Sequence, residues 1–211
     1  EIGGQAFAYT PFKGELNIPE TVNTIEFAAF SGTLFNGTLV LPSELIYLGD
    51  EVFRNCWRLS GVVEIPESLI AIPSYIFCDC IGLEGIVLHK NVEVIEACAF
   101  GNCFGITSIV CNPKTPPTID PSTFNGVAKD NFTIEVPEAS VNIYKNASNW
   151  SEFKRFAAHR EFSISRNLLR TLNDEHSKTF VLRAPSGENW SVESKPEWVT
   201  VEPMSGTGKT D

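Results

Sequence analysis

Histidine, long apolar runs and closely paired cysteines are scarce in this sequence, and each shortage argues against a class of function. The chain has three histidines, and no two of them stand at a spacing typical of a metal site. It has no GxSxG motif and no glycine-rich phosphate loop. No segment approaches the roughly 18 consecutive apolar residues of a membrane-spanning helix. We therefore expect no catalytic residues, no cofactor, no metal site and no membrane insertion.

Basic residues are also in the minority. The chain has 16 Lys and Arg against 26 Asp and Glu, which gives a formal net charge of −10. Residues 1–157 hold 18 acids and 9 bases, whereas residues 158–211 hold 8 acids and 7 bases. Nucleic-acid binding requires clustered Lys and Arg against the phosphates, so we expect no nucleic-acid partner.

Apolar residues recur at a fixed period in the acidic part of the chain. One column consists of phenylalanines at a nearly constant interval: Phe7, Phe30, Phe53, Phe77, Phe100 and Phe124. An aliphatic residue stands five positions before each of them: Ile2, Ile25, Leu48, Ile72, Ile95 and Ile119. Columns that hold register in this way predict a stack of short repeat units.

Each unit also contains a short β-like run. The runs are ELNIP, TLVLP, VVEIP, GIVLH and SIVCN, and the last strand is expected in FTIEVP. One unit of about 23 residues cannot bury its own apolar strand, so neighbouring strands should pair in parallel along one side. Proline ends the first three runs because it cannot extend a ladder. We expect turns and single helical turns on the opposite side.

Three of the six cysteines belong to this repeat. The position three residues after each column phenylalanine holds Thr10, Thr33, Cys56, Cys80, Cys103 and Val127. This pattern indicates a packing slot in which cysteine behaves as a small hydrophobe. No CxxC pair occurs that would suggest zinc or redox chemistry. Two interpretations remain: buried free thiols, which the column favours, and disulfides between neighbouring coils.

Side-chain alternation along the strands defines a candidate partner-binding surface. The residue between the two inward apolar side chains of each strand must point outward. These residues are Asn17, Val40, Glu64, Val87 and Val110, followed by Glu135. A second outward row holds Glu15, Thr38, Val62, Gly85 and Ser108. The valines form an apolar strip, which either reflects the β-propensity of valine or marks a protein-binding site.

The repeat unit resembles the BspA-like, or Treponema-type, leucine-rich repeat family, whose unit runs roughly as I-x-x-x-A-F-x-x-C-x-x-L-x-x-I-x-L-P. The best matches are IPSYIFCDCIGLEGIVLH from Ile72 and IEACAFGNCFGITSIVC from Ile95. The resemblance covers residues 1–157, where Val136–Lys154 looks like the closing segment of such arrays. It implies a leucine-rich repeat solenoid of the α/β horseshoe type, dominated by a parallel sheet of short strands. Val141, Tyr144, Trp150 and Phe153 are expected to cap the core.

Residues 158–211 follow a different pattern. Short β-rich runs at 161–172, 177–184, 189–194 and 198–203 predict antiparallel strands. The string NWSVESKPEWVTVEPMSGTGK resembles the BACON domain, which implies a partial all-β sandwich in residues 158–211. Trp190 and Trp198 could stack on sugar rings or pack in that core. A full sandwich needs further strands, so we expect the protein to continue beyond this segment.

The family resemblance implies a non-catalytic binding protein that is exported and held at or near the surface of an anaerobic bacterium. Its expected partner is a protein of the host or of a neighbouring cell. Two alternatives remain. One is a carbohydrate-binding accessory module for mucin or polysaccharide, suggested by the BACON-like part. The other is a spacer that displays another domain.

Overall fold

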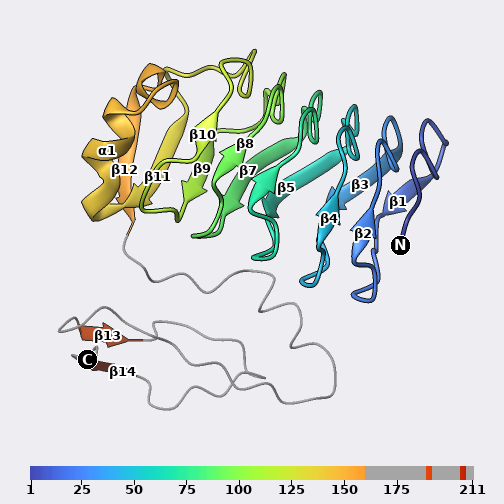
Figure 1. Cartoon of the computed structure of the whole chain (residues 1–211), viewed down its shortest axis with the longest axis horizontal. Coiled ribbons are helices and arrows are strands. Elements are labelled where there is room, and N and C mark those ends of the chain that lie inside the picture. Colours follow the sequence, from blue (N-terminus) through green and yellow to red (C-terminus); the bar gives the residue numbers. More distant parts are fainter. Residues whose placement is uncertain (160–188, 192–204, 208–211) are drawn as a thin grey trace. The chain divides into compact units, whose positions relative to one another are not determined.

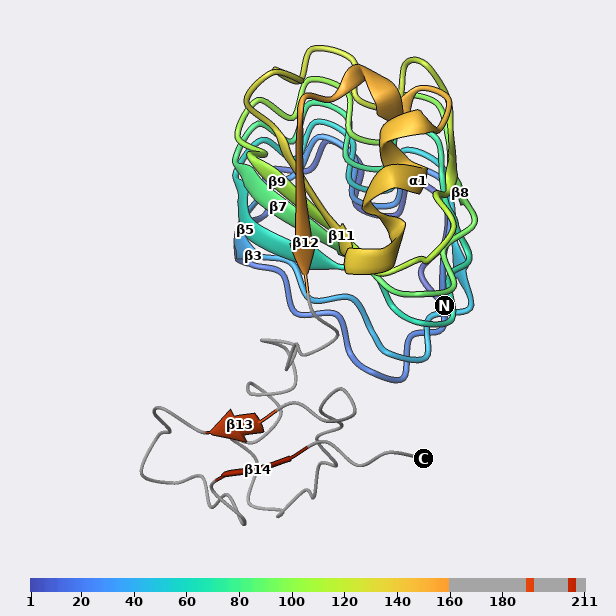
Figure 2. The ribbon, with the colours of Figure 1, turned by 90° about the vertical axis from the view of Figure 1, so that its left-hand side faces the viewer.

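A computed structural model describes residues 1–159, 189–191 and 205–207. Contacts between residues divide the chain into two units, Glu1–Ala158 and His159–Asp211. In the first unit the sequence repeats form successive coils of a solenoid, stacked from the N-terminus to helix α1 (Val141–Asn146) (Figure 1). Viewed along the stack, the coils lie behind one another with the long strands on one side (Figure 2).

A seven-stranded sheet forms one side of the solenoid, in the order β1-β3-β5-β7-β9-β11-β12. Its strands are β1 (Lys13–Glu15), β3 (Leu34–Thr38), β5 (Leu59–Glu64), β7 (Leu83–Leu88), β9 (Ser108–Cys111), β11 (Thr133–Pro137) and β12 (Arg155–His159). Successive strands from β1 to β11 pair in parallel. This confirms the predicted β-dominated leucine-rich repeat solenoid. Strand β12, which extends the sheet beyond the last repeat, was not predicted from the sequence.

The opposite side carries a second set of very short strands. They are β2 (Thr24–Ile25), β4 (Tyr47–Leu48), β6 (Ala71–Ile72), β8 (Val94–Ile95) and β10 (Thr118–Ile119). Strands β2 and β4 pair in parallel, as do β6, β8 and β10. Each contributes one aliphatic member of the predicted column to the core, from Ile25 to Ile119. Turns and single helical turns were expected here; the short strands arise because adjacent coils run side by side and their backbone groups need partners.

The phenylalanine column forms a continuous stack inside the solenoid. Ring centroids of consecutive members are 5.2, 5.6, 5.6, 5.9 and 5.4 Å apart from Phe7 to Phe124. The planes of neighbouring rings differ by 2–22°. All members except Phe7 are buried, and the inward pairs of the strands from Leu39 onward are buried with them.

A hydrogen-bonded turn surrounds each core phenylalanine and replaces the single helical turn that the sequence analysis expected. Around Phe30, the backbone N–H groups of Ala28, Phe30 and Gly32 donate to carbonyls of the next coil at 2.9, 3.0 and 2.8 Å. From Phe7 to Phe100, the residues two positions before and after the phenylalanine have positive φ angles, as at Glu51 (60°) and Asn55 (57°). Around Phe30, the N–H groups that lie between the three donors bond within their own coil, so every second N–H group of the turn points toward the next coil.

The last coil is closed by the segment that was expected to cap it. The segment contains η1 (Glu138–Ser140), α1 and η2 (Trp150–Glu152). Tyr144, Trp150 and Phe153 are buried, and Val141 packs against them. The Tyr144 hydroxyl donates to the Pro113 carbonyl at 2.9 Å, and the Trp150 indole N–H donates to the Pro117 carbonyl at 2.7 Å. These buried side chains cover the end of the core, and their polar atoms hold the proline-rich segment of the last repeat.

In the second unit, β13 (Asn189–Ser191) pairs antiparallel with β14 (Ser205–Thr207). Antiparallel pairing was expected for the run at 189–194. The runs expected at 161–172, 177–184 and 198–203 lie outside the described residues. Among the helices of the described residues, none has the length and apolar content needed to cross a membrane.

Phe77 provides a test of this architecture. Its ring is fully buried and stacks on Phe53 and Phe100. Replacing Phe77 with Ala should lower the free energy of unfolding by roughly 3–5 kcal/mol, because it removes a buried ring from two coil interfaces. The measurement is urea unfolding followed by circular dichroism.

The matched control is Glu84→Gln, which changes an exposed side chain in the same repeat. We expect it to alter the free energy of unfolding by less than about 0.5 kcal/mol. Equal destabilisation by the two substitutions would contradict the assignment of the core column.

Candidate functional site

Four of the predicted outward residues form a row across the regular part of the sheet. Glu64 pairs with Val87, Val87 pairs with Val110, and Val110 pairs with Glu135. The strand neighbours of these residues are buried, while the four themselves are half-buried. They therefore point away from the core, and we call them the sheet-face row. Its centre is apolar and both of its ends are acidic.

Asn17 and Val40 do not join this row. Strand β1 ends at Glu15 and β3 ends at Thr38, so both residues lie beyond the paired positions of their strands. Asn17 is exposed and Val40 is half-buried. In these first units the paired part of each strand ends before the residue that the apolar pattern places in the ladder. The expected ladder of outward residues therefore begins only at Glu64.

The second outward row lies beside the first. Val62 pairs with Gly85, Gly85 with Ser108, and Ser108 with Thr133. Gly85 is buried, and a Cβ at this position would lie 3.4 Å from both the Val62 side chain and the Ser108 carbonyl. This second row therefore places the small residues Gly85 and Ser108 next to the valines of the sheet-face row.

Two further apolar surfaces were missed by the sequence analysis. The first is an edge strip of Trp57, Ile81 and Phe104, each of which directly follows a cysteine of the packing slot. Their exposed fractions are 42%, 46% and 65%. These three residues recur at the repeat period, and this recurrence could have identified the strip from the sequence. A column of large apolar residues can be exposed even when it adjoins a buried slot.

The second missed surface lies on the short strands. Ile46, Tyr47 and Ile70 are more than half exposed and line a depression of about 320 Å³. Asp50 and Glu96 line the same depression. The signal for this surface was weak, because these residues occupy columns that hold polar residues in other repeats, such as Asn23 and Glu93.

The cysteines of the packing slot are buried, as predicted, but their environment is not purely apolar. The Sγ atoms of Cys56, Cys80 and Cys103 lie 3.1, 3.0 and 2.9 Å from a core phenylalanine carbonyl of the preceding coil. The Thr33 hydroxyl donates to the Phe30 carbonyl at 2.8 Å. The slot therefore accepts Thr and Cys because both can donate a hydrogen bond, and Val127 occupies it without one.

Burial controls the chemistry of these thiols. It raises the pKa of Cys56 and Cys80 above the usual value, and it raises the pKa of Cys103 to about 12. All six cysteines are free thiols in the structure. A thiol held in its neutral form is a poor nucleophile and a poor metal ligand, so this column is suited to packing and not to catalysis.

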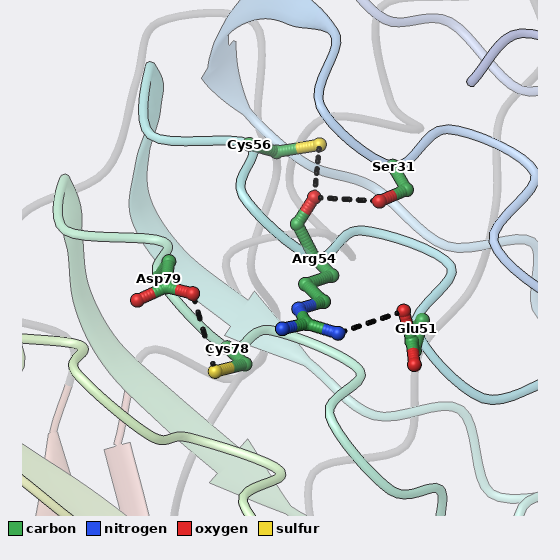
Figure 3. Close-up of polar contacts among 6 residues, drawn as sticks. All are labelled: Ser31, Glu51, Arg54, Cys56, Cys78 and Asp79. Carbon is green, nitrogen blue, oxygen red and sulfur yellow. Dashed lines mark hydrogen bonds and ion pairs between the residues drawn. The ribbon is translucent and has the colours of Figure 1, made fainter. Parts of the chain in front are cut away.

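A small polar cluster surrounds Arg54 on the outer turn (Figure 3). Its guanidinium donates to the Glu51 carboxylate at 3.0 Å and lies 5.2 Å from the centre of the Tyr75 ring. The hydrogen bond with Glu51 raises the pKa of Arg54. The Arg54 carbonyl accepts a hydrogen bond from the Ser31 hydroxyl at 3.2 Å. These contacts join successive coils, which indicates a structural role.

Cys78 and Asp79 lie at the neighbouring turn of the same cluster (Figure 3). The Cys78 thiol donates to the Asp79 carboxylate at 3.4 Å. Burial, followed by the charge of Asp79, raises the pKa of Cys78 to about 12. Asn102 of the next coil also donates to Asp79, at 2.9 Å. The carboxylate thus satisfies turn donors of two coils.

His89 is the one histidine whose side chain the structure describes, and both of its ring nitrogens are engaged. Nδ1 accepts from the Asn91 backbone N–H at 3.2 Å, which leaves Nε2 to donate to the Leu69 carbonyl at 2.8 Å. Across residues 1–159 and the two short described segments, no three His, Cys, Asp or Glu side chains are placed to share a metal ion.

A protein-family model described as "BspA type Leucine rich repeat region" matches residues 1–131 in 6 copies. One similar solved structure is a leucine rich cell surface protein from Faecalibacterium prausnitzii A2-165, with 18% sequence identity and a TM-score of 0.33. The match covers 72% of this chain and 54% of that one, so the chain spans about half of that protein's length. None of the curated proteins compared with the chain matches it. The BACON-like resemblance of residues 158–211 stays a prediction.

The thiol column generates a labelling prediction. At pH 8.5, Cys56, Cys80 and Cys103 should react with a maleimide or disulfide reagent more than about 100-fold more slowly in native protein than in denaturant. Burial restricts access, and a raised pKa lowers the thiolate fraction at any pH below it. Cys98 is only half-buried and should react first.

Peptide mass spectrometry after timed labelling identifies each site, and Cys98→Ser is the control for the fast phase. Rapid native labelling of the three slot cysteines, or a disulfide between any two of them, would contradict the prediction.

Proposed function

The chain belongs to the BspA-type leucine-rich repeat family, and we propose that it is a non-catalytic scaffold that binds another protein through the outward face of its long-strand sheet. We place this role outside the cell or on the surface of a bacterium, as the family resemblance implies. Adhesion to a protein of a host or neighbouring cell is the use that we assign to it.

The observation that carries this proposal is the sheet-face row. Val87 and Val110 stand side by side in register, and Glu64 and Glu135 flank them. A partner can remove the apolar centre from water without any change in the solenoid, since the backbone beneath it is already paired. An apolar patch with polar ends is the usual composition of a protein-binding surface.

Charge suggests the kind of partner. The region that carries the row has twice as many acids as bases, 18 against 9 over residues 1–157. A partner with an apolar ridge and flanking Lys or Arg would be electrostatically complementary to this acidic surface. It would associate faster at low ionic strength. Binding should therefore weaken with salt, mainly through the association rate.

The test is the double substitution Val87→Glu with Val110→Glu. Two carboxylates at the centre of the row should abolish protein binding, because a partner would have to bury unpaired charges, while the fold survives since both side chains point outward. Parent and variant are immobilised and exposed to surface proteins of bacterial and host cells, and the retained proteins are quantified by mass spectrometry.

Ile46→Glu with Ile70→Glu is the matched control, since it adds the same charge at exposed positions of the short-strand side. Circular dichroism confirms the fold of both variants. Partners that bind the parent should be retained by the control and lost from the test variant. A folded test variant that retains them like the parent would move the site elsewhere.

A further inference from the structure

An open depression of about 660 Å³ lies at the N-terminal part of the solenoid and is lined by Lys13, Gly14, Asn36, Trp57 and Arg58. These residues come from the first three repeats. Two of the nine bases in residues 1–157 meet here, and no carboxylate is among the lining residues. A site with this charge is unexpected on a strongly acidic molecule.

The depression lies where strand pairing departs from the repeat period. Lys13 pairs with Leu34, although the interval from Phe7 to Phe30 would set it opposite Asn36. Gly37 likewise pairs with Leu59, although the interval between the inward residues Leu39 and Val63 would set it opposite Gly61. Later pairs, such as Gly85 with Ser108, keep step with the repeat. In the first units the pairing therefore sets residues from different columns beside one another.

Glycine makes this irregular pairing sterically possible. Gly14, Gly37 and Gly61 have φ angles of 101°, 82° and 74°, which residues with a Cβ rarely adopt. A Cβ on Gly14 would meet no atom within 4 Å. The depression is therefore lined at this point by bare backbone, with room for a bound group.

The side chains around it present unused donors and an aromatic surface. The Arg58 guanidinium lies over the Trp57 ring, with its central carbon 4.7 Å from the ring centre. Among the described residues, the side chains of Lys13, Asn36 and Arg58 form no ion pair or hydrogen bond with one another or with any other side chain or backbone group. Trp57 is 42% exposed.

Each of these groups selects one feature of a ligand. A guanidinium fork and an ammonium favour a carboxylate. The exposed part of the indole favours the apolar C–H face of a ring, and the Asn36 amide can donate to and accept from hydroxyls. A carboxylate, an apolar ring face and hydroxyl groups occur together in an acidic sugar.

We infer that Lys13, Asn36, Trp57 and Arg58 form a binding site for a uronic-acid-type sugar residue in a polysaccharide. Arg58 and Lys13 hold the carboxylate, Trp57 packs against the ring, and Asn36 binds the hydroxyls. This site shares no residue with the sheet-face row or with residues 159–211.

The test is affinity gel electrophoresis of the whole chain in gels that contain polygalacturonate. The matched ligand is the same polymer with its carboxylates methyl-esterified, which keeps the rings and removes the charge. Poly-glutamate supplies carboxylates without sugar rings. The parent should be retarded by polygalacturonate alone, since a net charge of −10 excludes general attraction to a polyanion.

Trp57→Ala and Arg58→Gln should each weaken this retardation by about tenfold or more, because each removes a stacking or charge-assisted contact. Phe104→Ala is the matched control: Phe104 occupies the same column as Trp57, is exposed, and is followed by Gly105 instead of a base. Its retardation should equal that of the parent. Circular dichroism and urea unfolding verify the fold of every variant.

The inference is overturned if the parent is not retarded by polygalacturonate, or if the Trp57 and Arg58 variants are retarded as strongly as the parent. Equal retardation by the esterified polymer would overturn the role of the carboxylate. Equal retardation by poly-glutamate would overturn the sugar assignment in favour of an acidic peptide. The Val87→Glu and Val110→Glu variant should keep polygalacturonate binding, so this test stands apart from that of protein binding.

Discussion

The solenoid depends on the hydrogen bonds that the turn around a core phenylalanine makes with the next coil. From Phe7 to Phe100, three N–H groups of each turn reach acceptors on the next coil, and the bond from the phenylalanine itself lies between two residues of left-handed backbone. A left-handed residue with a Cβ is costly, and such positions persist where the surroundings over-determine them. Here the phenylalanine stack inside the solenoid and the hydrogen bonds between coils hold these residues in the left-handed conformation. Without a neighbour, one unit would lose both.

This construction separates what must be constant from what is free to vary. Ring stacking, the donor-bearing packing slot and the aliphatic column all face inward and all depend on an adjacent coil. The outward columns carry valine, glutamate, tryptophan or glycine without altering the coil beneath them. Binding chemistry can therefore be changed one repeat at a time, while stability remains a sum of nearest-neighbour interfaces.

The inward half of the structure was predictable because periodicity reports burial directly. The phenylalanine and aliphatic columns, the slot of Cys56, Cys80 and Cys103, and the cap at Tyr144 and Trp150 all follow from spacing and side-chain type. The left-handed turn was only partly predictable. Its second φ-positive position favours residues that tolerate positive φ, such as Gly32, Asn55 and Asp79. Its first φ-positive position holds residues as unlike as Glu51 and Cys98, and there the backbone hand is set by hydrogen bonds between coils. The short strands and β12 are likewise products of stacking.

The candidate binding surfaces were likewise predictable in part. The sheet-face row from Glu64 to Glu135 was predictable wherever strand pairing keeps step with the repeat. Asn17 and Val40 lie outside this row because strand pairing there falls short of the repeat spacing, and their part in partner binding stays a prediction. Gly14 and Gly37 were the available signal: each directly precedes a β-like run, and glycine in a strand often marks a break in pairing. The regular part of the sheet presents one row of equivalent positions, which suits an extended protein surface. The irregular part brings unlike columns together, and that is how a chain built from one repeat obtains a local, chemically mixed site.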